Sequence, residues 1–255
     1  MANRRKRIPS AVKSPFLRHV SVASEGVDTA SYPFNIPAFS KGIDLDFATR
    51  VTFFVGENGS GKSTLLEAIA QRCGFNAEGG GRDHHFGRDE ELSPLARALE
   101  LSWSLKVNDG FFMRAESFFN FASYLEESGS TFNRYGGTPL HQQSHGESFL
   151  ALFANRFDAG IYILDEPEAA LSPARQLSFL SIVHRLERGG NAQFLISTHS
   201  PIIFAYPGAT VLSLDGDAMT RVDFKSTEHY RLTKQFLDSP ERFFKHLFDE
   251  DSELE

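Results

Sequence analysis

The chain has 255 residues, of which 41% are hydrophobic and 23% are charged, and its formal net charge at pH 7 is −7. This length and composition suit one large α/β domain over residues 1–255, with room for a small inserted lobe. No apolar run approaches the ~20 residues that a membrane-spanning helix needs, and no secretory signal is expected. The single cysteine, Cys73, excludes an internal disulfide and is typical of a cytoplasmic protein.

The charge distribution does not predict a broad basic surface that would bind nucleic acid. Acidic residues are concentrated at the C-terminal end, and the net charge argues against broad DNA-binding surfaces, although a local basic groove remains open. The basic run 4–7 could touch nucleic acid or anionic lipid, but a solvated chain end is the simpler interpretation. Residues 1–15 and 249–255 are expected to be flexible.

The first half is organised around a phosphate-binding loop of the form G-x-x-x-x-G-K-[ST]. Its members are Gly56, Glu57, Asn58, Gly59, Ser60, Gly61, Lys62 and Ser63. The β-branched and aromatic run 51–55 before the loop predicts a buried strand. The apolar residues at 65, 66, 69 and 70 predict one face of a helix that begins at Ser63. Residues 16–47, which contain two prolines, are expected to supply edge strands before this unit.

A strand, loop and helix in this order predict a nucleoside triphosphate site. The glycines let backbone N–H groups surround an anion, and the helix N-terminus adds its positive dipole end. Lys62 is expected to reach the β- and γ-phosphates and Ser63 to hold Mg²⁺, with Thr64 completing the nucleotide-binding set. Phe34 and Phe39 are candidates for stacking on adenine, although aromatic residues in such a place more often belong to the core.

Further along the chain, strands and helices alternate, which predicts a mainly parallel sheet. Residues 95–106 are expected to form a helix and a strand, and 111–113 a buried strand. The elements expected after these are strands at 161–164 and 193–196, a helix that begins at Pro173 after an N-cap at Ser172 and carries Leu177 and Val183, a hairpin over 211–222 and a terminal helix over 240–248.

Two acidic residues end the strand at 161–164. Asp165 is suited to hold Mg²⁺, directly or through water, and Glu166 to polarise an attacking water, which a hydrolase needs. Without the phosphate loop, the pair would read as an acidic turn. His199 follows the strand at 193–196, at the sheet edge where nucleotide sites of open α/β sheets lie. It could contact the γ-phosphate and the attacking water, whereas alone it would read as a capping histidine.

A third stretch precedes an apolar helix. Ser144 and Gly146, with Glu147 after them, offer backbone N–H groups at a helix start that could bind a γ-phosphate. Because the phosphate loop already surrounds the phosphates of its own chain, this second site would serve the ATP of a partner. A two-fold homodimer would then hold two nucleotides. By itself the stretch could be a plain N-cap.

In this order, the phosphate loop (Walker A), the stretch at 144–147, the acidic strand (Walker B) and His199 resemble the ABC-type ATPases. Residues 144–147 stand where that family has its signature motif, and 169–172 stand at its D-loop. The chain is most similar to the compact, stand-alone bacterial ATPases related to DNA-repair and chromosome-maintenance ATPases, also through residues 112–120 and 227–230. The resemblance implies an α/β P-loop fold with a mainly parallel sheet flanked by helices, an antiparallel edge and a small helical lobe at about 75–150.

Two departures from the family pattern limit what is carried over. No clear Q-loop glutamine follows the strand at 111–113, and Glu116 or Arg114 stands nearest. The interval between loop and signature also lacks the heptads of a long coiled coil.

The resemblance implies ATP and Mg²⁺ as cofactors and an ATP-dependent homodimer. Glu166, His199 and Lys62 would be catalytic, and Ser63 and Asp165 would hold the metal. A role as a soluble switch in a nucleic-acid-related or defence process is expected. The alternatives are the nucleotide-binding subunit of a membrane transporter, which the missing glutamine disfavours, and an ATP-gated switch for another protein.

Overall fold

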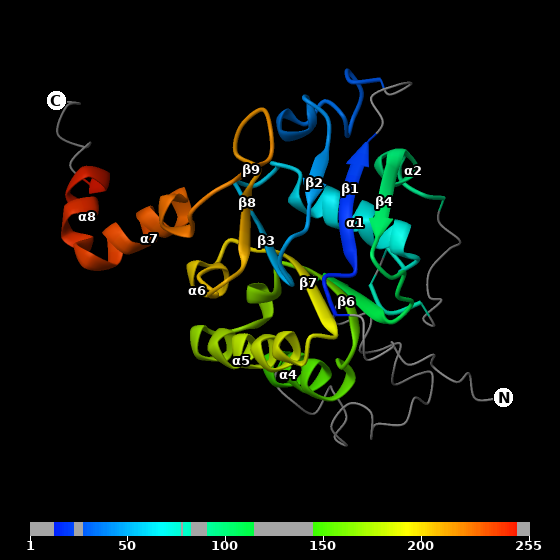
Figure 1. Ribbon diagram of the computed structural model, residues 1–255. Helices are drawn as coiled ribbons and strands as arrows, with labels where there is room; N and C mark the ends of the chain where they lie inside the picture. Colours follow the sequence, from blue (N-terminus) through cyan, green and yellow to red (C-terminus); the bar gives the residue numbers. More distant parts are fainter. Residues whose placement is uncertain (1–12, 23–27, 78, 83–90, 115–144, 249–255) are drawn as a thin grey trace.

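The computed structural model describes residues 13–22, 28–77, 79–82, 91–114 and 145–248. Its centre is a six-stranded sheet in the order β5-β6-β7-β3-β8-β9 (Figure 1). The strands are β3 (Val51–Val55), β5 (Gly110–Arg114), β6 (Gly160–Asp165), β7 (Ala192–Ser197), β8 (Thr210–Ser213) and β9 (Thr220–Arg221). All neighbours pair in parallel except β9, which is antiparallel to β8. The mainly parallel α/β sheet and the hairpin predicted from the sequence are therefore confirmed.

A second, three-stranded antiparallel sheet lies beside the first. It contains β1 (Leu17–Val22), β2 (Asp44–Asp46) and β4 (Leu99–Trp103) in the order β2-β1-β4. The edge strands expected within residues 16–47 thus belong to a sheet of their own, in which β1 pairs with β2 on one side and with β4 on the other. The fully buried Gln193 joins the two sheets. Its Oε1 accepts hydrogen bonds from the backbone N–H groups of Phe16 and Leu17 at 2.7 and 2.9 Å, and its Nε2 donates to the Leu17 carbonyl at 2.9 Å.

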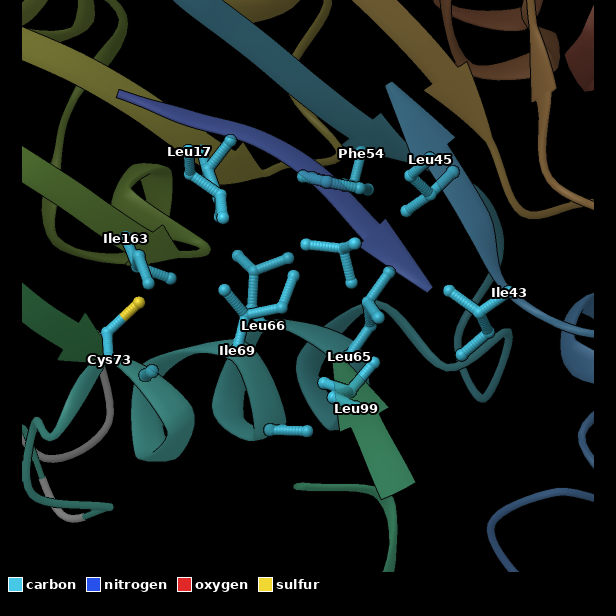
Figure 2. Packing of buried hydrophobic residues seen from close by; sticks show 14 of the residues in the cluster. Leu17, Ile43, Leu45, Phe54, Leu65, Leu66, Ile69, Cys73, Leu99 and Ile163 are labelled. Carbon is cyan, nitrogen blue, oxygen red and sulfur yellow. The ribbon is translucent and has the colours of Figure 1, made fainter. Parts of the chain in front are cut away.

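Helix α1 (Lys62–Cys73) packs between the two sheets. Leu65, Leu66 and Ile69 are fully buried, as the sequence pattern predicts, and they meet side chains from β1, β3 and β6 (Figure 2). The short helices η1 (Pro37–Phe39) and α2 (Pro94–Ala98) close the same core. Burying each large apolar side chain contributes about 1.5–3 kcal/mol, so this core fixes the start of α1, and with it the phosphate loop, against the central sheet.

The opposite face of the central sheet is covered by α4 (His145–Arg156), α5 (Pro173–Gly189) and α6 (Pro201–Phe204) (Figure 1). Phe149 and Phe153 of α4 meet Phe179 of α5, with ring centroids 6.5 and 5.3 Å apart. Ser172 holds the N-cap position before α5, as expected, but its hydroxyl makes no capping hydrogen bond. Leu177, expected on the packing face of α5, is exposed, because Phe179 and its neighbours supply the buried face instead.

The last two helices, α7 (Glu228–Asp238) and α8 (Pro240–Phe248), project from the body after the short helix η5 (Phe224–Ser226) (Figure 1). The sequence predicted α8 with these bounds but not α7. No residue of either helix is buried, and Leu232, Leu237 and Leu247 are largely exposed.

Among the described residues, no helix has the length and apolar character needed to cross a membrane. Of the expected helical lobe at about 75–150, residues 78, 83–90 and 115–144 lie outside the described part of the chain, as do the termini 1–12 and 249–255.

Candidate active site

The C-terminal ends of the parallel strands bring the polar residues of the motifs to one edge of the central sheet. In the strand register, Arg114 of β5 lies beside Asp165 of β6, and Asp165 lies beside Ser197 of β7. Ser197 in turn pairs with Phe54 of β3, two residues before the phosphate loop. Parallel strands all end at this edge, which is where open α/β sheets bind their ligands.

The phosphate loop has a backbone that only glycines adopt readily. Gly56, Gly59 and Gly61 have φ angles of +147°, +81° and +100°. A Cβ at Gly61 would lie 2.8 Å from the ring of Phe39, so η1 packs directly against the loop. Phe39 is accordingly part of the core and is only 3% exposed, which makes it a packing residue rather than a platform for adenine.

Two side chains hold the loop in shape. Lys62 is buried, and its Nζ donates to the carbonyls of Gly56 and Glu57 at 2.7 and 3.0 Å. Burial lowers the pKa of Lys62, and Glu166 and the neighbouring carboxylates oppose that shift. Asp215, which follows β8, accepts a hydrogen bond from the backbone N–H of Glu57 at 2.7 Å. Asp215 was not among the residues predicted for the site, although it directly follows a predicted strand.

The interior of the loop fits a phosphate group. Ser60 Oγ is buried there, 2.9 Å from where a Cβ of Gly56 would stand, and it has no hydrogen-bond partner among the described residues. A Cβ at Gly59 would meet no atom within 4 Å, so the loop is open at that position. Glu57, Asn58 and Gly59 are exposed. An orphaned hydroxyl and glycine backbone at a helix start are suited to phosphate oxygens.

The residues expected to hold the metal are in contact. Ser63 Oγ donates to Asp165 Oδ1 at 3.1 Å, and Ser197 Oγ donates to the same oxygen. Burial raises the pKa of Asp165, although both hydroxyls and the nearby Arg114 favour its ionised form. A carboxylate and an alcohol at a phosphate loop are oxygen donors of the kind that Mg²⁺ prefers, so this pair fits the metal.

Arg114, one of the two residues nearest to the missing Q-loop glutamine, lies beside the carboxylate of Asp165. Its Nε is 3.6 Å from Asp165 Oδ2, and its Nη1 is 3.2 Å from Glu67 Oε2 on α1. The structure thus brings a guanidinium beside the carboxylate that is expected to hold Mg²⁺. Glu116, the other residue near this position, lies outside the described residues.

Glu166 lies next to Asp165 but in a different environment. Its backbone has a φ of +51°, the one positive value of a non-glycine among the described residues, and its side chain is 40% exposed. Such a left-handed conformation costs on the order of 1 kcal/mol or more and is found preferentially at functional sites. The turn directs the chain into η4 (Pro167–Ala170) and places Glu166 Oε1 3.4 Å from His199 Nε2.

His199 is held by hydrogen bonds at two positions. Its backbone N–H donates to Glu168 Oε1 at 2.6 Å, and its Nδ1 lies 2.8 Å from His229 Nε2. Its Nε2 is buried and makes no hydrogen bond within the described part of the chain. Burial and the Lys62 ammonium lower the pKa of His199, while Glu166 opposes them. Neither Glu168 nor His229 was given a role from the sequence, although the stretch 227–230, which contains His229, is among those that resemble the family.

The stretch expected to serve a partner chain begins α4. Ser144 lies outside the described residues, whereas Gly146 is buried and Glu147 is exposed. A Cβ at Gly146 would lie 2.7 Å from Arg175 Nη1 and 2.9 Å from the carbonyl oxygen of Ala170. Arg175 Nη2 also pairs with Glu147 Oε1 at 3.0 Å. The start of α4 is therefore packed tightly against the turn that follows Glu166.

An exposed aromatic residue beside the loop was not singled out from the sequence. Tyr32 is 68% exposed, and its hydroxyl lies 3.1 Å from Thr64 Oγ1 in the first turn of α1. Phe34, a candidate for base stacking, is instead partly buried against the core. The neighbouring Pro33, which interrupts any strand pattern, was the one available sign that Tyr32 would sit in a surface turn.

Comparison with known proteins gives consistent matches. Residues 34–98 match a family described as "AAA domain", and residues 94–205 match one described as "AAA domain, putative AbiEii toxin, Type IV TA system". The chain is 29% identical over 209 residues to the ribose import ATP-binding protein RbsA 2 of Burkholderia ambifaria, a match that covers 72% of this chain and 40% of that protein. The chain thus spans less than half the length of the curated relatives it matches.

Among solved structures, the SMC head domain from Thermotoga maritima aligns with a TM-score of 0.48 at 17% identity, covering 82% of this chain and 99% of that one. CbiO1 from Clostridium perfringens, part of the ABC transporter complex cbiONQ, aligns with a TM-score of 0.47 at 16% identity, covering 91% and 99%.

Proposed function

Since this chain belongs to the superfamily of ABC-type ATPases, we propose that it binds ATP with Mg²⁺ at the phosphate loop and hydrolyses it. The observation that carries the proposal is that two pairs of polar side chains lie together at one edge of the central sheet. Ser63 and Asp165 are 3.1 Å apart, and beside them Glu166 and His199 are 3.4 Å apart. The first pair suits a metal and the second suits an attacking water.

In the proposed complex, residues of this chain bind and orient the triphosphate. The N–H groups of the loop from Gly56 to Ser63 surround the phosphates, with Thr64 beside them, and Lys62 turns from the loop carbonyls to the β- and γ-phosphates. Mg²⁺, when bound, neutralises charge that develops on the β- and γ-phosphate oxygens. Ser63 and Asp165 would hold it.

Glu166 would accept the proton of the attacking water, and His199 would donate from Nε2 to the γ-phosphate. Both roles suit the geometry. Glu166 is partly open to solvent, where water has access, while His199 Nε2 is buried and makes no hydrogen bond to any described residue. Arg114, next to Asp165, would add a positive charge at this end of the site in place of the Q-loop glutamine.

We further propose that two copies close around two ATP molecules. Ser144, Gly146 and Glu147 would bind the γ-phosphate of the partner's nucleotide. This arrangement is supported by the tight packing of Gly146 against the Ala170 carbonyl, which keeps the start of α4 beside the turn after Glu166. Hydrolysis would remove the phosphate that bridges the copies and let them separate.

The test of both proposals is Glu166→Gln, which keeps the shape of the side chain but removes the base. Turnover should fall by about 10²–10⁴-fold, and size-exclusion chromatography with ATP and Mg²⁺ should show a stable dimer. Glu100→Gln, an exposed substitution on β4, is the matched control and should behave as wild type. If Glu166→Gln elutes only as a monomer with ATP bound, the sandwich is wrong. If wild type has no turnover, the hydrolase proposal is wrong.

The biological role follows less directly. We favour a soluble, cytoplasmic switch in a nucleic-acid-related or defence process, on the motif resemblance. A transporter subunit is the second candidate, because curated relatives include ribose import ATP-binding proteins. ATP turnover should be measured with and without duplex or single-stranded DNA. Stimulation by DNA supports the nucleic-acid-related role over the transporter role. If DNA has no effect, capture of partners with trapped Glu166→Gln protein distinguishes a membrane component from another protein partner.

A further inference from the structure

A second histidine lies at the proposed site without a role in the chemistry so far. His229, in the first turn of α7, places Nε2 2.8 Å from His199 Nδ1, with the ring centroids 4.8 Å apart and tilted by 51°. Its side chain is 19% exposed. Together with the packing of Tyr230 on Phe224, this contact joins α7 to the body of the domain.

The short distance between His199 Nδ1 and His229 Nε2 means that one of these two nitrogens carries a proton and the other accepts it. A neutral imidazole donates from one ring nitrogen and accepts at the other, and its tautomer is set by the bond that the other nitrogen makes. At 2.8 Å, one proton lies between His199 Nδ1 and His229 Nε2. Either His229 donates, and His199 keeps its own proton on Nε2, or His199 donates from Nδ1 and leaves Nε2 bare.

Charges on both sides favour the first arrangement. His199 Nε2 faces Glu166 Oε1 at 3.4 Å, and a bare nitrogen lone pair facing a carboxylate would be repelled, whereas an N–H is attracted. His229 Nε2 also lies 3.8 Å from Glu57 Oε1, which favours a proton on that nitrogen.

The other charged groups around the pair are few. Lys62 comes from the phosphate loop, Glu168 from η4 and Glu228 from the start of α7. Burial and Lys62 lower the pKa of His199, which favours the neutral ring with a single proton on one of its nitrogens.

We infer that His229 is a positioning residue: its Nε2–H donates to His199 Nδ1 and so keeps the His199 proton on Nε2, directed toward the γ-phosphate. The phosphate part of this statement rests on the proposed function. The tautomer part rests on the contact between the two histidines and on the carboxylates of Glu166 and Glu57 beside them, and it holds in protein without nucleotide.

The tautomer is measured directly by long-range ¹H–¹⁵N correlation spectra of the full chain labelled at histidine nitrogens, without nucleotide and at neutral pH. His199→Asn identifies the signals of His199. Wild type should show His199 protonated at Nε2 and not at Nδ1. His229→Ala should shift both nitrogens toward averaged values, and His229→Gln, whose amide can donate to Nδ1, should restore the wild-type pattern. A wild-type proton on Nδ1, or no change in His229→Ala, overturns the inference.

Kinetics then test the consequence. His229→Ala should lower kcat roughly tenfold without changing the Kd for ATP, and His229→Gln should recover most of the loss. Tyr230→Leu is the control, because it loosens the packing of α7 on Phe224 (ring centroids 5.4 Å apart) but keeps His229. If Tyr230→Leu lowers kcat as much as His229→Ala does, the effect is packing and the inference fails. Absence of turnover in wild type contradicts the proposed function, and the spectra still decide the tautomer.

Discussion

The proposed site has two regions that differ in how far the chain alone determines them. The floor, formed by Lys62, Ser63, Asp165 and Ser197, is buried or partly buried and already connected by hydrogen bonds. The rim, formed by Tyr32, Glu147 and Glu166, is exposed by 40–68%. The difference indicates that the floor is preorganised by the fold, whereas the rim side chains stay accessible to solvent beside their own partners Thr64, Arg175 and His199.

A preorganised floor has a cost in the free protein. A buried carboxylate is disfavoured by loss of hydration, and Asp165 is held in place by Ser63 and Ser197 despite a raised pKa. The rim bears no such burden, since its charges remain solvated. Substitutions in the floor should therefore change both stability and chemistry, and substitutions in the rim should change only ligand-dependent properties.

The largest effect is expected for Asp165→Asn in the floor. Turnover should fall at least ~100-fold, because the carboxylate for the metal is lost. The free protein should nevertheless melt at a higher temperature, because burial disfavours the ionised form. Asp238→Asn, at an exposed pair with Lys234, is the control. A variant that is inactive and also less stable than wild type would contradict this account of the floor.

The raised pKa of Asp165 also predicts how the stability of the protein depends on pH. The folded-state pKa of Asp165 is raised above its unfolded value, so between the two values the folded state binds more protons. The contribution of Asp165 to the free energy of unfolding therefore rises as pH falls through that window. Denaturant titrations of wild type and Asp165→Asn at a series of pH values should show that the difference in stability shrinks as pH falls.

An intermediate effect is expected for Gly146→Ala, at the boundary between floor and rim. Its Cβ would come within 2.9 Å of the Ala170 carbonyl oxygen, so the start of α4 must shift. ATP-dependent dimerisation in the Glu166→Gln background should weaken about tenfold, as expected for overpacking by 1–3 kcal/mol, while the Kd for ATP of the monomer stays unchanged. Gly189→Ala, whose Cβ would meet no atom within 4 Å, is the matched control. Equal dimerisation in both variants would contradict a role for Gly146.

The smallest effect is expected for Tyr32→Ala in the rim. If the exposed ring of Tyr32 contacts the bound nucleotide, its loss should weaken ATP binding about three- to tenfold. The melting temperature of the free protein should not change. Tyr32→Phe removes only the contact with Thr64 Oγ1 and should bind ATP almost as wild type does. Titration with a fluorescent ATP analogue measures both. An unchanged affinity in Tyr32→Ala would exclude Tyr32 from the nucleotide site.

Within the floor, Lys62 and Ser63 were the residues most readily predicted from sequence, because they belong to contiguous signals, whereas Ser197 was given no role. The strand before Gly56, the glycines of the loop and the apolar face of α1 stand within about twenty residues, and each predicts the next. Asp165 and His199 follow runs that are recognisable as buried strands. Their meeting depends on strand order, which the alternation of strands and helices suggests but does not specify.

The partners of these residues were beyond sequence reasoning for a physical reason. His229 lies in the first turn of α7, and the spacing of apolar residues along this helix does not show which other element it approaches. Glu168 reaches back to the His199 N–H through a tertiary contact. Tyr32 and Phe39 are both aromatic residues near prolines, and only packing decides that one faces solvent and the other the core.

The buried amide of Gln193 has a mechanical consequence. Its three hydrogen bonds to Phe16 and Leu17 lie in a dry interior, where losing one would leave an unpaired polar group costing about 1–3 kcal/mol. The seam between the two sheets therefore resists bending, and the sheets should turn together as one rigid block. Any hinge that responds to ATP must lie elsewhere in the chain.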